Sequence, residues 1–291
     1  MQPTEPQALR TGEPSRTALG AALLRAAHQL LERPLVFEDP VALRILGAEA
    51  RRQIALDSER YQAPLARSLR AFLVARSRYT EDELARAFRG GTAQYVVLGA
   101  GLDTFAYRNP YGERVRVFEV DHPDTQAWKR ARLQEHGIAA PPTLAFVPVD
   151  FERDSLADRL RAAGFRDTEP AFISWLGVSM YLTADAVMQT LRFVPAACAR
   201  GSEIVFDFSV PDEALGARER ESRTRLAERV AGIGEPWISH FDPVSLACEL
   251  AAMGLAVVND FGAKEANERY FANRTDGFGV RGSTRIMTAR I

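Results

Sequence analysis

Two glycines and an aspartate stand in this sequence at a spacing that suits a nucleotide-like ligand. Gly99 and Gly101 follow the apolar run Tyr95-Val-Val-Leu98, which is typical of a strand buried on both faces. Glycines at such a strand end allow a sharp turn and leave room for a ligand. A second apolar run, Val115-Arg-Val-Phe-Glu-Val120, ends in Asp121, about 20 residues past the glycines, where a carboxylate can accept hydrogen bonds from ribose hydroxyls. The pattern predicts a cofactor site, and a glycine turn without a ligand is the alternative.

The residues around the turn indicate which cofactor is bound. A dinucleotide site normally has a third glycine where this chain has Thr104, and Asp103 would place negative charge where phosphates bind. A third apolar run ends in Asp150-Phe151, which fits an adenine pocket because the carboxylate can accept from the exocyclic amine while the ring packs on the aromatic side chain. Asp150 could instead cap the segment that follows it. Taken together, these residues favour S-adenosyl-L-methionine over NAD.

The elements that must position these residues alternate between strand and helix after Gly90-Gly91. Apolar runs predict strands at residues 95–99, 115–120, 144–149, 171–176, 203–208, 255–260 and 284–290, with helices between them. Before Gly90 we expect helices from Ser15 to Leu31, near 41–46, at 63–77 and at 80–87, the last opened by a capping box, Thr80-Glu-Asp-Glu83. Alternating charges over 212–233 predict an exposed helix inserted after the fifth strand, and 243–253 reads as another helix stopped by Gly254.

Composition narrows the class of protein. The chain has 291 residues, of which 46% are hydrophobic and 26% are charged, with a formal net charge of −1. These values are typical of a globular protein with a substantial core, and no net basic charge favours nucleic acid. No apolar stretch is long enough to predict a membrane span, and no signal peptide opens the chain. Because the two cysteines suit a reducing compartment, we expect a cytoplasmic protein. No residue cluster has metal-ligand spacing.

Longer motifs extend the pattern over almost the whole chain. They are Arg25-Ala-Ala-His, Pro34-Leu-Val-Phe-Glu-Asp-Pro40, Ala75-Arg-Ser-Arg-Tyr-Thr-Glu-Asp-Glu-Leu84, Tyr95 to Thr104, Ala106-Tyr-Arg108, Phe118-Glu-Val-Asp-His-Pro123, Val147-Pro-Val-Asp150, Ser174-Trp-Leu-Gly-Val-Ser-Met-Tyr-Leu182 and Tyr270-Phe-Ala-Asn-Arg-Thr-Asp-Gly277. With these motifs the chain resembles the bacterial branch of the leucine carboxyl methyltransferase-like family of S-adenosyl-L-methionine-dependent methyltransferases.

The resemblance implies an α/β class I methyltransferase (Rossmann-like) fold, with a mostly parallel seven-stranded sheet and helices on both faces. We expect residues 1–15 to form a flexible tail and 16–291 to form a single methyltransferase domain. Within that domain, 16–90 would be an N-terminal helical cap and 91–291 the core, with a helical insert at about 211–240.

The resemblance also implies which residues hold the cofactor. Arg76 would bind the methionine carboxylate, for which a guanidinium fork is suited, and Gly99 and Gly101 would lie under the methionine moiety. Asp121 would bind the ribose, and Asp150 with Phe151 the adenine. Arg25 stands roughly where a family cation approaches the carboxylate, although it could equally be a solvated helix residue. The chain departs from the family at Leu176, where many relatives have a glutamate that faces the cofactor. Backbone groups near residues 174–177 could take over that role.

The predicted reaction is an in-line methyl transfer to oxygen of a small molecule, with carboxyl groups ahead of phenols. A carboxylate acceptor is ionised at neutral pH and needs no general base, whereas a phenol needs one. His240 and Tyr270 are the weak candidates for a catalytic residue. An NAD(P)-dependent oxidoreductase on the same strand and turn pattern, or a cofactor-binding protein without catalysis, is the alternative. By analogy of fold alone we expect a role in secondary metabolism.

Overall fold

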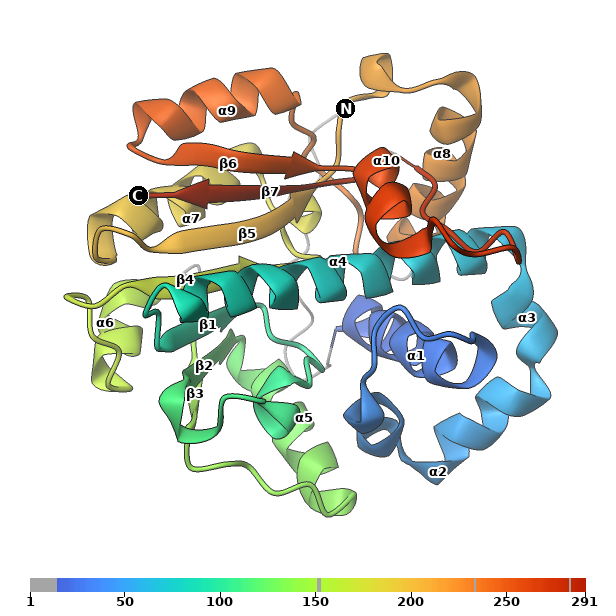
Figure 1. Cartoon of the computed structure of the whole chain (residues 1–291), viewed down its shortest axis with the longest axis horizontal. Helices are drawn as coiled ribbons and strands as arrows, with labels where there is room; N and C mark the ends of the chain where they lie inside the picture. Colours follow the sequence, from blue (N-terminus) through green and yellow to red (C-terminus); the bar gives the residue numbers. More distant parts are fainter. Residues whose placement is uncertain (1–14, 151–152, 233, 283) are drawn as a thin grey trace.

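The computed structural model describes residues 15–150, 153–232, 234–282 and 284–291. Its centre is a seven-stranded sheet with the order β3-β2-β1-β4-β5-β7-β6 (Figure 1). The strands β1 to β5 are parallel, and β7 runs antiparallel to both β5 and β6. This order and direction define the class I methyltransferase fold that the resemblance implied.

All seven predicted strands are present, each within two residues of its predicted ends. They are β1 (Gln94–Leu98), β2 (Arg116–Asp121), β3 (Leu144–Pro148), β4 (Ala171–Trp175), β5 (Glu203–Phe208), β6 (Ala256–Phe261) and β7 (Arg285–Arg290). Alternate residues of β1 enter two different hydrophobic clusters, Val96 and Leu98 in one and Tyr95 and Val97 in the other. The sheet is therefore covered on both faces, which explains the uninterrupted apolar runs in the sequence.

The helices that cover the sheet occupy the predicted gaps between strands. The helices α5 (Pro123–Glu135), α6 (Leu156–Ala162) and α7 (Ala184–Ala197) follow β2, β3 and β4. After β5 come the largely exposed α8 (Ala217–Ala231), which is the predicted charged insert, and α9 (Pro243–Ala252). A short helix, α10 (Ala263–Ala266), continues into a π-helical turn over 267–271, which the sequence analysis did not predict.

The N-terminal helices lie beside the carboxyl ends of the central strands (Figure 1). The first, α1 (Arg16–Leu31), begins at the predicted cap, because the Ser15 side chain accepts a hydrogen bond from Ala18 N. The second, α2 (Pro40–Leu56), starts as predicted but continues past a kink at Gly47, and α3 (Ser58–Gln62) follows it. The helices α1 and α2 pack on each other in their own hydrophobic cluster.

The two helices predicted at 63–77 and 80–87 are one helix, α4 (Pro64–Arg89). The prediction of a helix start at Thr80 was wrong because its hydroxyl donates to Arg76 O, one turn back, at 2.9 Å, and caps nothing. The buried face of α4, with Ala71, Val74 and Leu84, runs through the supposed break, so packing keeps the helix continuous. One long helix carries Arg76 to the carboxyl ends of β4 and β5.

Candidate active site

The glycine turn after β1 is packed closely by neighbouring segments. Gly99 has φ +64° and Gly101 has φ +46°, a conformation that side chains disfavour. A Cβ atom built on Gly99 would lie 2.4 Å from Val178 Cγ2, and one on Gly101 would lie 3.2 Å from Ala18 Cβ. Glycine is therefore required at position 99 both by conformation and by space. The loop after β4 and the start of α1 both contact this turn.

Asp121 ends β2 beside the turn and is held by backbone amides. Its Oδ2 accepts a hydrogen bond from Gly101 N at 2.5 Å, and its Oδ1 accepts one from His122 N at 2.7 Å. Burial raises the pKa of this carboxyl, and the two amides partly offset the effect. Each oxygen retains a lone pair for a further donor. Gly101 and Asp121, both predicted as cofactor-binding residues, therefore lie in contact in the structure.

Asp150 follows β3 at the same edge of the sheet, since Val149 N donates to Asp121 O at 2.9 Å. The Asp150 backbone amide donates to Asp154 Oδ2 at 2.9 Å, and Arg153 Nε lies 3.6 Å from its carboxylate. Phe151, the other residue predicted at the adenine, lies outside the described residues.

Arg76 on α4 reaches the same edge and forms an ion pair that the sequence analysis did not predict. Its Nη1 donates to Asp207 Oδ2 at 2.5 Å, and Asp207 Oδ1 accepts from Gly177 N at 2.6 Å. Asp207, near the end of β5, is fully buried, whereas Arg76 keeps 13% of its side chain exposed. The signal for Asp207 was a single carboxylate at the end of an apolar strand, the same signal that identified Asp121.

Leu176 and its neighbours show how the end of β4 is arranged. The Leu176 side chain packs against the hydrophobic cluster on the α4 side of the sheet. The backbone amide of Gly177 is bonded to Asp207, and the Ser174 hydroxyl lies 2.9 Å from Tyr95 Oη. One of the backbone groups expected to replace the family glutamate, the Gly177 amide, therefore already has a protein partner.

The start of α1 and the segment after α8 lie together at the glycine turn. The Glu235 carboxylate accepts from Arg16 N at 2.8 Å and Thr17 N at 3.2 Å, and also from the Ser15 and Thr17 hydroxyls. A carboxylate at a helix N-terminus is stabilised by the unpaired amides and by the helix dipole. Glu235 thus binds the first turn of α1 to the segment after α8, next to the point where Ala18 packs on Gly101.

Arg25, further along α1, contacts the glycine turn. Its Nη2 donates to Leu102 O at 2.6 Å, and its Nη1 lies 3.6 Å from Asp103 Oδ2. Its Nε is buried and has no hydrogen-bond partner among the described residues. Arg25 therefore contacts the glycine turn and is not a solvated helix residue, which was the alternative interpretation.

Tyr270 and His240, the two candidates for a catalytic residue, make contacts away from the glycine turn. The Tyr270 hydroxyl donates to Asp82 Oδ2 at 2.8 Å, and burial raises its pKa. His240 is exposed at the surface. Its pKa is lowered by the partial loss of water around the ring and by the nearby Arg223 guanidinium. No hydrogen bond in the described structure joins either side chain to the glycine turn, Asp121 or Arg76.

A buried ion pair lies behind Asp121. Lys129 Nζ on α5 is 2.7 Å from Glu119 Oε2 on β2, and each side chain is at most 2% exposed. Burial raises the pKa of Glu119 to about 7, against the lowering effect of Lys129. This carboxyl is therefore set to change charge near neutral pH.

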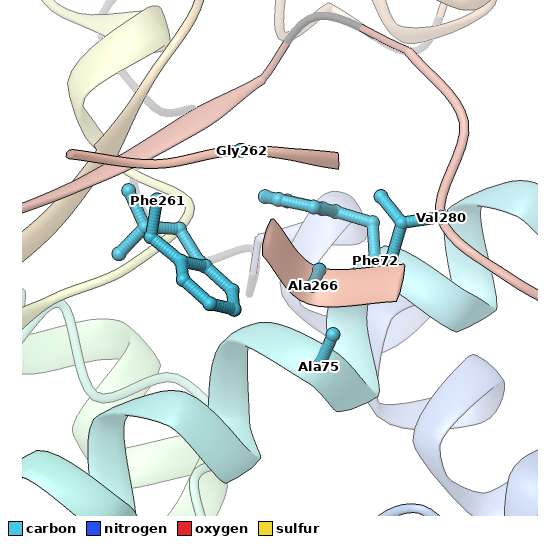
Figure 2. Close-up of a pocket in the computed structure, with 7 residues that line it drawn as sticks. Phe72, Ala75, Phe261, Gly262, Ala266 and Val280 are labelled. Atoms are coloured by element: carbon cyan, nitrogen blue, oxygen red, sulfur yellow. The ribbon is translucent and has the colours of Figure 1, made fainter. Parts of the chain in front are cut away.

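Apolar side chains fill the space between α4 and the segment that joins β6 to α10. Figure 2 shows Phe72 and Ala75 of α4 beside Phe261, Ala266 and Val280, and the cavity between them has no room for a water molecule. A larger groove of about 230 Å³ is lined by Phe37, Glu38, Arg78, Glu81, Asp82, Phe105, Pro110 and Tyr111. None of the predicted cofactor-binding residues that the structure describes lines either cavity.

Two structural findings concern membranes and metals. No helix in the described parts of the chain combines the length and the apolar character needed to cross a membrane. Within those same parts, no group of three or more His, Cys, Asp or Glu side chains is arranged to hold a metal ion.

The order and direction of the strands are those of the class I methyltransferase fold. A putative methyltransferase from Thermobifida fusca has the same fold, with a TM-score of 0.58 and 19% identity, over 97% of this chain and 96% of that one. A DUF574 family protein from Streptomyces avermitilis also has a TM-score of 0.58, with 16% identity over 93% and 96% of the two chains.

Comparison of the sequence identifies the family. The model of the leucine carboxyl methyltransferase family matches residues 18–195. The "Putative S-adenosyl-L-methionine-dependent methyltransferase YktD" of Bacillus subtilis is 32% identical over 92% of this chain and 95% of its own. A similarly named protein of Frankia alni is 33% identical over 78% of each chain. The chain belongs to the leucine carboxyl methyltransferase family of S-adenosyl-L-methionine-dependent methyltransferases, as its motifs predicted.

Proposed function

We propose that this chain transfers a methyl group from S-adenosyl-L-methionine to a carboxylate oxygen of a small molecule. The observation that carries the proposal is the convergence of Arg76, the glycine turn and Asp121 at the carboxyl ends of β1, β2 and β4 in a member of this family. In open α/β sheets, this edge is where ligands bind.

The residues at this edge fit the cofactor. The two carboxylate oxygens of Asp121 accept hydrogen bonds from backbone amides alone, so each can accept another from one hydroxyl of a ribose diol. Arg76 keeps part of its guanidinium exposed for a carboxylate. Gly99 and Gly101 carry no side chains at the turn, where Val178 and Ala18 pack on them, and Asp150 stands next along the edge for the adenine amine. When bound, the cofactor supplies an electrophilic methyl group on a sulfonium.

The protein's contribution is to orient the reactants and exclude water. Ala18 of α1 covers the turn, and Glu235 fastens the start of α1 to the segment after α8. Tyr181 lies close to the same segment, and its pKa is raised by burial, partly offset by Thr17 and Trp237. A covered site of this kind aligns an in-line displacement and strengthens electrostatic contacts.

The surroundings of the turn favour a carboxyl over a phenol as the acceptor. His122, which follows Asp121, uses Nδ1 to accept from Asp124 N at the start of α5. His28 bonds to Glu32, and His136 contacts Arg132, so neither reaches the turn through a hydrogen bond in the described structure. A carboxylate is already ionised at neutral pH and needs no base. The family description, leucine carboxyl methyltransferase, names the same group.

The experiment combines binding with methyl transfer. Calorimetry should show S-adenosyl-L-methionine binding, and Asp121→Asn should weaken it about tenfold by replacing charge-assisted hydrogen bonds with neutral ones. Asp158→Asn, on the exposed first turn of α6, is the matched control and should bind as the unaltered protein does. Isotope-labelled methyl from the cofactor should then enter carboxylic acids as esters that release methanol in alkali.

The outcomes separate the alternatives. Alkali-stable products from phenols alone would refute the carboxyl acceptor but keep the methyltransferase. Binding without transfer to carboxylic acids, phenols or amines would indicate a cofactor-binding protein without catalysis. A chain that binds NAD(P) and not S-adenosyl-L-methionine would overturn the proposal.

A further inference from the structure

In the ion pair of Arg76 and Asp207, both carboxylate oxygens have protein partners. Asp207 is fully buried, and its two oxygens are divided between two partners, Arg76 Nη1 at 2.5 Å and Gly177 N at 2.6 Å. A buried carboxylate is costly unless its lone pairs are satisfied in this way. The one carboxylate therefore ties α4 and the loop after β4 to β5.

The guanidinium of Arg76 is fixed on two sides. Its Cζ lies 5.6 Å from the centre of the Phe72 ring, one turn earlier on α4, and its Nη1 is bonded to Asp207. In the described structure, Nε and Nη2 have no hydrogen-bond partner. Because guanidinium donors form a rigid planar fork, fixing Nη1 also fixes the direction of the other two nitrogens.

The loop held by Asp207 is the one that contacts the glycine turn. Gly177 donates to Asp207, and a Cβ atom at position 177 would lie 3.0 Å from both terminal nitrogens of Arg76. The next residue, Val178, packs on Gly99. Asp207 thus sets the spacing between the guanidinium and the turn on which the methionine part of the cofactor would lie.

We infer that Asp207 is a positioning residue that holds Arg76 in the orientation needed to bind the cofactor's carboxylate. This inference rests on the proposed function. It gives Asp207 a selective role: its loss should affect the recognition of the carboxylate and leave recognition of the adenosine unchanged. A carboxylate that served only the stability of the fold would show no such selectivity.

The test compares two ligands that differ only in that carboxylate. Calorimetry is carried out with S-adenosyl-L-methionine and with its decarboxylated analogue, on the unaltered chain and on Asp207→Asn. The asparagine can still accept from Gly177 N but turns an amide donor toward Arg76. We expect affinity for S-adenosyl-L-methionine to fall about tenfold, the worth of one oriented charge-assisted contact, while affinity for the analogue changes less than about twofold. Equal losses for both ligands, or no loss for either, would overturn the inference.

The same strand and helix provide a matched control. Glu203, at the other end of β5, is a buried carboxylate that pairs with Arg86 of α4 and accepts from Arg290 Nε at 2.9 Å. Glu203→Gln removes a comparable α4–β5 ion pair far along the strand from the glycine turn. It should lower the melting temperature without changing the ratio of the two affinities. A changed ratio would show that any such ion pair alters selectivity, and would overturn the inference.

A second variant keeps the test decisive if Asp207→Asn does not fold. Arg76→Gln combined with Asp207→Asn replaces the buried ion pair by a neutral pair and leaves no lone charge. If Asp207 acts through Arg76, this double variant binds S-adenosyl-L-methionine no more weakly than Arg76→Gln alone, in which Asp207 is left as an unpaired buried charge. A further loss in the double variant would contradict the inference. Failure of the unaltered chain to bind S-adenosyl-L-methionine would instead refute the proposed function, so the two failures are distinguishable.

Discussion

Replacing Gly99 by alanine tests the close packing of the glycine turn. Gly99 has φ +64°, and the added methyl would lie 2.4 Å from Val178 Cγ2. The left-handed conformation costs an alanine about 1 kcal/mol. Relieving the overlap, which requires movement of Val178 or the backbone, costs about 2 kcal/mol more. We therefore expect Gly99→Ala to lower the free energy of unfolding by about 3 kcal/mol.

Two further variants separate these contributions. Gly112→Ala is the matched control, since Gly112 has φ +57° with no atom within 4 Å of the added Cβ, so it should cost only about 1 kcal/mol. Val178→Ala removes the atom that is overlapped. In the Gly99→Ala background it should therefore restore about 2 kcal/mol relative to the sum of the two single changes.

The assay is urea unfolding without added ligand, because a bound cofactor would add its own stabilisation. The reasoning is refuted if Gly99→Ala costs no more than Gly112→Ala. It is also refuted if the effects of Gly99→Ala and Val178→Ala simply add, which would show that the Val178 contact relaxes without cost.

Three other changes have definite expected outcomes. The pKa of the Glu119 carboxyl is about 7 in the folded chain, against an ordinary value of 4.5. The neutral carboxyl therefore adds about 3 kcal/mol to the free energy of unfolding below pH 4.5, and this contribution is lost as the pH rises to 7. Glu119→Gln with Lys129→Met should remove this pH dependence in urea unfolding. Glu235→Gln weakens the charge-assisted bonds at the start of α1, and it should cost about 1 kcal/mol and speed hydrogen exchange in the first turn. Glu32→Gln leaves the fully buried Arg70 without a carboxylate and should lower the free energy of unfolding by about 3 kcal/mol.

Controls and contrary results are simple to define for these three. The unaltered chain and the double variant at 119 and 129 are compared by their free energies of unfolding. If the difference between them stays constant from pH 4.5 to 7, the titration of Glu119 is contradicted. Glu221→Gln, which removes an exposed pair on α8, should change stability by less than about 0.5 kcal/mol. If it matches Glu235→Gln or Glu32→Gln, the geometry assigned to those two carboxylates is not the cause.

The sequence by itself determined the order of elements and the position of the glycine turn. Seven apolar runs specified seven strands because strands buried on both faces need uninterrupted hydrophobic residues. Gly101 and Asp121 were recognisable as strand-end residues, and they lie in contact in the structure because parallel strands joined by one crossover end at the same edge. The family followed from motifs that are themselves local in sequence. Periodic and local patterns of this kind are readable without coordinates.

Tertiary packing decided the contacts between residues far apart in the chain. Thr80 has a helix-start pattern, yet α4 continues through it because its buried face packs on the sheet. The pairing of Arg76 with Asp207 joins residues 131 apart, and Glu235 caps a helix that begins 219 residues before it. No local pattern encodes such contacts, since they depend on which strand ends and loops the completed sheet brings together. The sequence located the glycine turn, and only the folded chain showed that Asp207 pairs with Arg76.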